Sequence, residues 1–388
     1  MNPATLLTHA GRPQGATVTV NPVVARTSTV IFDSVATLQG ALAAYAAGER
    51  PLVYGRKGTS TTHALEDVLT ALEGGHRTRL FGSGLAAIAC TFLAYLRPGD
   101  HVLVIDSCYE PVRKLCAQYF AGMGVTVEYF RPDLSDLAAK LRGNTRLVWV
   151  ESPGSLLYEM CDLPALLSMV RQAGEAIVAV DSTWGSGLLY HPLALGADVS
   201  VIAGTKYLVG HSDAMLGVAV AGERAWPALA AMADLLGHSV SADDAYLALR
   251  GMRTLAVRLQ YQQTGALEVA QWLQRQPQVR TVFHPALPDD PGHALWLRDC
   301  KGANGLLSIE LRPSVTEAQV HAFVDALQLF GLGHSWGGFE SLVLPVQMAA
   351  VRTLSSWDGR GPVVRLHVGL EAIADLLADL QQALARIG

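Results

Sequence analysis

Two polar residues that follow apolar segments indicate the chemistry this chain could perform. Lys206 comes shortly after the apolar run 199–202, and Asp181 ends the apolar run 176–180. A lysine can hold the aldehyde of pyridoxal phosphate as a Schiff base, and an aspartate can pair with the protonated ring nitrogen of that cofactor. Two unrelated loop residues are the plainer interpretation of such a pair. The neighbouring segments favour the cofactor, because they contain the other groups that it needs.

Other polar residues could bind the phosphate, the ring and an amino-acid substrate. The segment Gly82-Ser83-Gly84-Leu85 precedes a predicted helix, and backbone N–H groups at a helix start can bind a phosphate. Thr205 could add a hydroxyl to the same phosphate. Tyr109 could stack on a pyridine ring, and Arg365 could bind a carboxylate through two parallel hydrogen bonds. Taken singly, these residues are more typical of a tight turn, a partly buried tyrosine and an exposed strand arginine.

Helical and strand-like patterns alternate from about residue 60 and would position these groups. Strands are predicted shortly before Ser83-Gly84, Tyr109, Asp181 and Lys206, and helical periodicity lies between them. This alternation predicts an α/β fold, with a mostly parallel sheet flanked by helices. Ligands collect at the carboxyl ends of the strands in such sheets, so one crevice could hold all four positions.

The character of the sequence changes twice along the chain. Residues 1–58 are rich in Pro, Thr and Gly and predict an extended N-terminal arm. Residues 59–252 form the predicted cofactor-binding α/β domain, and residues 253–388 a smaller C-terminal α+β domain. In this last part we expect helices near 255–273, 317–329 and 372–387, and strands at 306–311, 342–345 and 363–368.

Composition excludes several classes of function. The chain has 388 residues and a net charge of −5 without acidic or basic blocks, which disfavours nucleic-acid binding and binding to an anionic membrane. No secretory signal or membrane span is apparent. The five cysteines have no CxxC spacing, so we expect free thiols in a reducing cytoplasm and no metal site. Only 16% of the residues are charged, which suggests a large buried surface, either in a large α/β core or between subunits.

Several segments in a fixed order give the chain a family resemblance. It resembles the bacterial cystathionine β-lyases, a group within the Cys/Met-metabolism family of pyridoxal phosphate enzymes, from the N-terminal arm to the last helix. The most specific segments are Tyr54-Gly55-Arg56-Lys57-Gly58-Thr59, Glu151-Ser152-Pro153-Gly154-Ser155, Thr205-Lys206-Tyr207-Leu208-Val209-Gly210-His211-Ser212-Asp213-Ala214, Ser335-Trp336-Gly337-Gly338 and Arg365-Leu366-His367-Val368-Gly369-Leu370-Glu371.

The resemblance implies a fold, an activity and a set of site residues. It implies the aspartate-aminotransferase-like fold and α,β-elimination of an amino-acid substrate, L-cystathionine, by a homotetramer built from two active dimers. Lys206 would bind the cofactor covalently and move protons, Asp181 would pair with the ring nitrogen and Tyr109 would stack on the ring. The other implied contacts are to the phosphate from Gly84, Leu85 and Thr205, to the neighbouring subunit's phosphate from Tyr54 and Arg56, and to the substrate carboxylate from Ser335, Trp336 and Arg365.

Some positions differ from the family pattern, and the sequence is compatible with other functions. Ala203 replaces a common serine, and Asp234 stands near the position of a tyrosine that lines the distal substrate pocket. A γ-lyase or a cysteine desulfhydrase is the nearest alternative, although the bulk of Trp336 favours β-cleavage. A non-catalytic nucleotide-binding α/β protein is a more distant one. Several histidines have no partner that the sequence identifies, and we interpret them as structural or as supports for site residues that they contact: His63, His211, His238 and His367.

Overall fold

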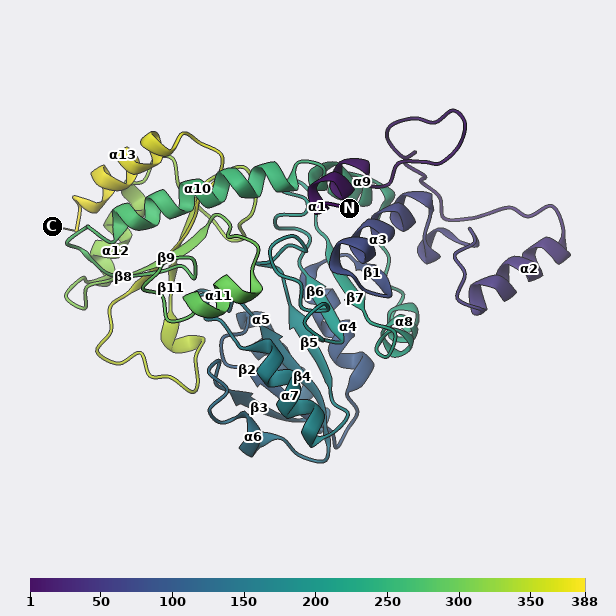
Figure 1. Cartoon of the computed structure of the whole chain (residues 1–388), viewed down its shortest axis with the longest axis horizontal. Helices are drawn as coiled ribbons and strands as arrows, with labels where there is room; N and C mark the ends of the chain where they lie inside the picture. The colour runs from purple at the N-terminus through teal and green to yellow at the C-terminus, as the bar shows by residue number, and fades with distance from the viewer. Residues whose placement is uncertain (388) are drawn as a thin grey trace.

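The computed structural model describes residues 1–387, and a seven-stranded sheet forms its centre (Figure 1). The strand order is β1 (Arg77–Phe81), β7 (Gly217–Ala221), β6 (Val199–Ile202), β5 (Ile177–Asp181), β4 (Thr145–Glu151), β2 (His101–Ile105) and β3 (Thr126–Phe130). Strand β7 runs antiparallel to both of its neighbours, and all the other pairs are parallel. The predicted mostly parallel sheet is therefore confirmed.

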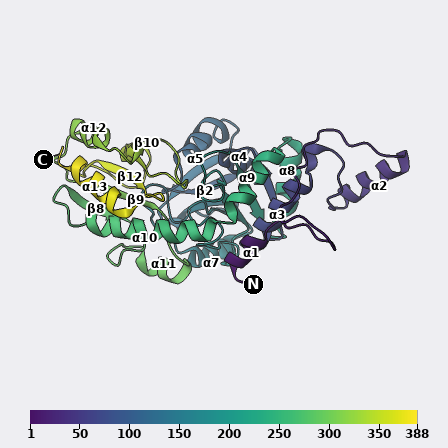
Figure 2. The same cartoon turned by 90° about the horizontal axis from the view of Figure 1, so that it is seen from above.

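Helices cover both faces of this sheet, which explains why its inner strands β2, β5 and β7 are almost wholly apolar. Every residue of β2 and β7 is buried. Figure 2 shows α4 (Gly84–Tyr95) and α7 (Leu163–Ala173) on opposite sides of the sheet. A strand covered on both faces has no solvent side, so its sequence is a continuous apolar run without alternation. The carboxyl ends of the parallel strands therefore carry the first polar residues after each run.

A second, five-stranded sheet forms the C-terminal part of the molecule. Its order is β10 (Gly331–Leu332), β11 (Leu342–Val346), β12 (Val363–His367), β9 (Leu306–Leu311) and β8 (Val279–Phe283). Three further helices belong to this part, namely α11 (His293–Asp299), α12 (Glu317–Ala326) and α13 (Ile373–Leu384). The first strand pair is parallel and the other three pairs are antiparallel.

One long helix connects the two sheets and fixes their relative position. Leu255 and Leu259 of α10 (Leu255–Leu273) belong to the core of the large sheet, whereas Ala266 and Val269 belong to the core of the small one. A helix that contributes to two cores resists movement of one against the other, because sliding would expose apolar side chains. Strand β12 and its polar residues are thereby held over the edge of the large sheet.

The N-terminal segment differs from the expected extended arm, because it contains two helices. Asn2 caps α1 (Pro3–His9), and Leu7 of this helix is buried in the large core. Ser34 caps α2 (Val35–Ala46), which contains no buried residue and projects from the body of the molecule (Figures 1 and 2). The remaining α-helices are α3 (Ser60–Glu73), α5 (Glu110–Leu115), α6 (Leu137–Lys140), α8 (Trp226–Leu235) and α9 (Ala242–Met252).

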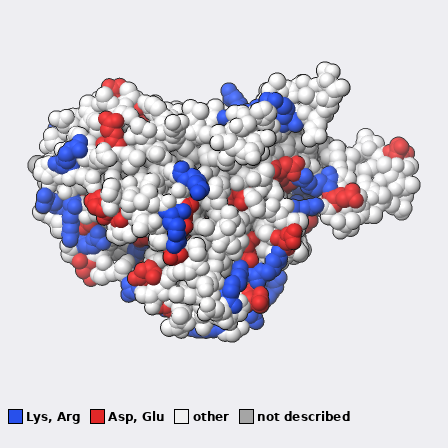
Figure 3. All heavy atoms as spheres, in the orientation of Figure 1, with Lys and Arg blue, Asp and Glu red and all other residues white. Residues whose placement is uncertain are grey.

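The surface carries both signs of charge in small mixed groups. Figure 3 shows this for one face of the molecule, with no large area of a single sign. Such a surface provides no extended electrostatic field for a polyanion. Within residues 1–387, none of the helices combines the length and the apolar character that crossing a membrane would require.

Candidate active site

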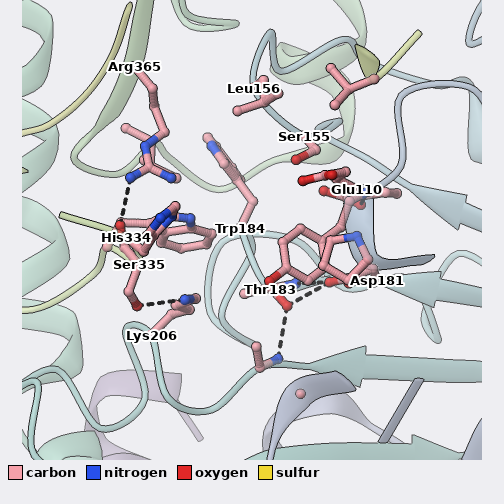
Figure 4. Close-up of a pocket in the computed structure, with 18 of the residues that line it drawn as sticks. Glu110, Ser155, Leu156, Asp181, Thr183, Trp184, Lys206, His334, Ser335 and Arg365 are labelled. Atoms are coloured by element: carbon pink, nitrogen blue, oxygen red, sulfur yellow. Dashed lines mark hydrogen bonds between the residues drawn. The ribbon is translucent and has the colours of Figure 1, made fainter. Parts of the chain in front are cut away.

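A cavity of about 590 Å³ lies where the carboxyl edge of the large sheet meets the small sheet. Segments that follow β2, β4, β5 and β6 line it from one side, and residues of β11, β12 and the loop before them line it from the other. Nine of the eleven predicted site residues border this cavity: Gly84, Leu85, Tyr109, Asp181, Thr205, Lys206, Ser335, Trp336 and Arg365. Figure 4 shows the side chains of Lys206, Ser335 and Arg365 gathered on one side in this view, with Asp181 on the other.

Lys206 presents its amine to this cavity from the loop after β6. Its Nζ donates to Ser335 Oγ at 2.6 Å, and it lies 5.5 Å from the centre of the Trp336 ring. Burial lowers the pKa of Lys206 to about 8, and the positive charge of Arg365 acts in the same direction. The negative charge of Asp181 opposes this shift only in part. A substantial fraction of the amine is therefore neutral near physiological pH, as a nucleophile or base must be.

Asp181 provides a buried carboxylate at the end of β5. One oxygen, Oδ1, accepts from Thr183 N at 3.0 Å and from Thr183 Oγ1 at 2.6 Å. Thr183 Oγ1 also accepts from Ala203 N at 2.9 Å, so one threonine joins the carboxylate to the loop that carries Lys206. Burial raises the pKa of Asp181 above its ordinary value, although the bonds from Thr183 oppose the rise. A cation beside the second oxygen would offset that desolvation.

Glu151 is a site residue to which the sequence analysis assigned no role. It ends β4 directly beside Asp181 on β5, and its Oε2 accepts from Tyr109 N at 2.6 Å. Burial raises the pKa of Glu151 well above its ordinary value, and the neighbouring Asp181 adds to the rise. The bond fixes the backbone of Tyr109, whose side chain lines the cavity. The signal in the sequence was the position of Glu151 at a strand end, like that of Asp181.

The start of α4 offers an anion site at one end of the cavity. Ser83 Oγ caps the helix by accepting from Ala86 N, which leaves the N–H groups of Gly84 and Leu85 without an acceptor within residues 1–387. Free N–H groups and the helix dipole favour a phosphate there. Thr205 Oγ1 is shared with the backbone of Leu216, to which it donates at 3.2 Å and from which it accepts at 2.9 Å.

Arg365, on β12, places a buried guanidinium at the end of the cavity opposite the start of α4. Its Nη2 donates to Ser335 O at 2.8 Å, and its Nε has no hydrogen-bond partner in the described part of the chain. Only 7% of the residue is exposed, and burial lowers its pKa. A buried cation with unused donors is costly unless an anion joins it. A substrate carboxylate would satisfy that requirement.

Tyr54 and Arg56 lie outside the cavity that contains Lys206. Arg56 Nη1 donates to the backbone oxygen of Asp234 at 3.3 Å, and Tyr54 is 45% exposed. The carboxylate of Asp234 accepts from Tyr45 Oη at 2.9 Å and pairs with Arg79 at 3.1 Å. Asp234 therefore belongs to this separate polar cluster and does not line the cavity. A single chain does not bring Tyr54 and Arg56 to its own lysine.

The residues that line the cavity fit pyridoxal phosphate. The oxygen Oδ2 of Asp181 accepts no hydrogen bond within residues 1–387, so it is available to a protonated ring nitrogen. The two unpaired N–H groups at the start of α4 suit a phosphate. Lys206 offers an amine whose pKa of about 8 makes it reactive towards an aldehyde. These three groups come from three neighbouring loops at one edge of the sheet.

Comparisons with known proteins agree with this site. The Cys/Met metabolism PLP-dependent enzyme family matches residues 4–385. Cystathionine beta-lyase of Bordetella avium is 50% identical, covering 98% of this chain and 97% of its own length. The enzyme of that name from Salmonella typhimurium is 44% identical, covering 99% and 98%. A structure of cystathionine gamma synthase from Xanthomonas oryzae pv. oryzae with cystathionine is 33% identical, with a TM-score of 0.90 and coverage of 100% and 98%. The chain therefore belongs to the Cys/Met metabolism family of PLP-dependent enzymes.

Proposed function

We propose that this chain is a carbon–sulfur lyase that catalyses α,β-elimination of L-cystathionine. With one water the products are homocysteine, pyruvate and ammonia, because the three-carbon fragment left by elimination hydrolyses. The observation that carries the proposal is the set of three charged groups in one cavity: the Lys206 amine, the Asp181 carboxylate and the Arg365 guanidinium. The names of the relatives at 50% and 44% identity support the choice of substrate.

Each of these groups has a part in the proposed reaction. When bound, pyridoxal phosphate supplies an electron sink for the charge that develops at the substrate Cα. Asp181 would hold the ring nitrogen, and the start of α4 would hold the phosphate. Lys206 Nζ removes the Cα proton and then donates a proton to the departing sulfur, which it can do because its pKa is about 8. Arg365 and Ser335 orient the substrate through its carboxylate.

The keto acid that is released distinguishes β-cleavage from the alternatives. We expect purified enzyme incubated with L-cystathionine to release pyruvate, together with homocysteine. Release of 2-oxobutyrate with cysteine would instead assign γ-cleavage and overturn the proposal. The position of Trp336 favours pyruvate, because its ring lies 5.4 Å from that of Tyr207 and beside the amine of Lys206, where it narrows the cavity.

The low pKa of Lys206 predicts a specific labelling profile. In cofactor-free protein, acetylation of Lys206 should reach half its maximal rate near pH 8, because only the neutral amine reacts. The rate rises as the pH increases through that value. Lys301 is exposed and serves as the reference lysine. Competitive labelling followed by mass spectrometry measures both, and identical profiles for the two lysines would contradict the assignment.

Replacing Arg365 with lysine should weaken substrate binding more than it slows turnover. Lysine keeps the positive charge but loses the planar fork that holds a carboxylate through two bonds. We expect KM for L-cystathionine to rise about 10- to 100-fold, with kcat changed much less. Steady-state kinetics measures both constants. Arg360→Lys is the matched control, since Arg360 pairs with Glu310 outside the cavity. An unchanged KM in Arg365→Lys would remove this residue from the carboxylate site.

We further propose that the enzyme is a cytoplasmic homotetramer, in which Tyr54 and Arg56 reach the phosphate of a neighbouring subunit. Helix α2 has no buried residue in the single chain, and exposed apolar residues such as Ile31, Val35 and Leu42 lie along this segment. Apolar side chains on a projecting segment favour burial against another copy. A mass in solution of four times 41.3 kDa is the expected result, and a monomer would contradict it.

A further inference from the structure

The loop that carries Ser335 and Trp336 has a strained backbone close to Lys206. Ser335 has φ of 75°, in the left-handed region that side chains other than glycine rarely adopt. Gly337 has φ of 90°, and a Cβ there would lie 2.9 Å from Tyr207 N and 3.0 Å from Lys206 C. The loop is thus pressed against the segment that carries the reactive lysine. A strained backbone persists only where its surroundings hold it in place.

The side chain of His367 forms hydrogen bonds with the backbone of this loop. It is fully buried on β12, and its Nε2 lies 3.1 Å from Gly337 N while its Nδ1 lies 3.0 Å from Glu340 O. A backbone N–H can only donate and a carbonyl oxygen can only accept. The ring is therefore neutral, with its proton on Nδ1. Burial lowers the pKa of His367 to about 3, so this state persists at every pH at which the enzyme would work.

Strand β12 therefore holds the loop at two points. Arg365 and His367 are two residues apart, so their side chains project from the same face of the strand. Arg365 Nη2 donates to Ser335 O at 2.8 Å, and His367 Nε2 accepts from Gly337 N. The ring of Tyr207, the residue after the lysine, lies 5.9 Å from that of His367 and 5.4 Å from that of Trp336. The neutral ring of His367 thus contacts both the loop that carries Ser335 and the segment that carries Lys206.

We propose that His367 is a positioning residue that places Ser335 and Trp336 against Lys206. Its bond to the N–H of Gly337 keeps the strained turn in the form in which Ser335 Oγ lies 2.6 Å from Lys206 Nζ. The consequence for turnover rests on the proposed function, in which Lys206 moves the proton and Ser335 orients the substrate. The effect of His367 on the conformation of the loop does not depend on that function.

Two substitutions test the two hydrogen bonds of His367 separately. In His367→Asn the side-chain amide can still donate to Glu340 O, but it is too short to reach Gly337 N. In His367→Gln the amide oxygen stands where Nε2 was and can accept from Gly337 N. We expect His367→Asn to lower kcat/KM at least about tenfold and His367→Gln to recover most of the loss. Hydrogen exchange of the Gly337 amide in the purified enzyme should accelerate in the Asn variant and return towards the wild-type rate in the Gln variant.

A control and a double substitution exclude a merely structural role. His284 is also fully buried but lies outside the cavity, so His284→Asn should leave exchange at Gly337 unchanged. In a Ser335→Ala background, His367→Asn should cost much less than it does in the wild type, because both act through one contact. Equal costs in the two backgrounds, or unchanged exchange at Gly337, would overturn the proposal. Absence of pyruvate from the wild-type enzyme would overturn the proposed function instead, while the exchange result would still decide the role of His367.

Discussion

Lys206→Ala should abolish turnover of L-cystathionine while leaving the fold intact. The amine has two proposed tasks, the covalent hold on the cofactor and the proton transfers at Cα and sulfur, and no other lysine lines the cavity in the described part of the chain. General acid–base catalysis alone contributes about 10²- to 10⁴-fold, so we expect kcat to fall by at least about 10⁴-fold when both tasks are lost. Pyruvate release, followed with a coupled reductase, measures the effect.

The fold should tolerate this change, because the backbone of Lys206 makes its own contacts. Its N–H donates to Ala203 O at 3.0 Å, and that bond does not depend on the side chain. Lys301→Ala is the matched control, since Lys301 is exposed and remote from the cavity. Wild-type turnover is expected for it. If Lys206→Ala retained even a hundredth of the wild-type kcat, Lys206 would not be the proton-transfer group.

Most elements of the sheet were predictable from local pattern, whereas their order was not. Helix 255–273 and strand 306–311 have the predicted bounds, because long helical periodicity and a bounded apolar run are strong local signals. The antiparallel place of β7 between β1 and β6 was not expected, because an apolar run indicates a strand but not the direction in which the strand runs.

Helix α2 shows where local pattern fails. Its sequence, VATLQGALAAYA, is rich in alanine and contains no charged residue, and none of its residues is buried. Without charged residues to mark a polar face the helical period is a weak signal, and we therefore expected an extended arm. Within residues 1–387 nothing buries this helix, and its exposure is one reason for proposing that a neighbouring subunit covers it.

The candidate site was predictable only to the extent that strand ends define it. Asp181, Tyr109 and Lys206 follow strands whose carboxyl ends share one edge, so their convergence was expected from the α/β pattern. Ser335 lies 129 residues after Lys206, and its contact with the amine came from family resemblance and not from spacing. Glu151 received no role, because its partner is a backbone N–H that only the folded loop presents.

Asp181→Asn should be the second most damaging substitution. Asn keeps the volume of the side chain, and its oxygen can still accept both bonds from Thr183, so the local structure should persist. The negative charge is lost, however, and the new NH₂ group presents a donor where a protonated ring nitrogen needs an acceptor. Removing one partner of a buried charge pair costs roughly 3–5 kcal/mol, so we expect kcat to fall about 10²- to 10⁴-fold.

Asp379→Asn distinguishes this loss from the general cost of altering a buried carboxylate. Asp379 is 6% exposed, as Asp181 is, and it accepts from the backbone N–H groups of Gln328 and Leu329 in the small domain. Its replacement should lower the melting temperature and leave kcat per bound cofactor close to wild type. Cofactor content is measured for both variants, so that loss of the cofactor is not mistaken for loss of catalysis. Equal kcat values per bound cofactor in the two variants would show that the Asp181 charge is not used, since of these two carboxylates only Asp181 lines the cavity that contains Lys206.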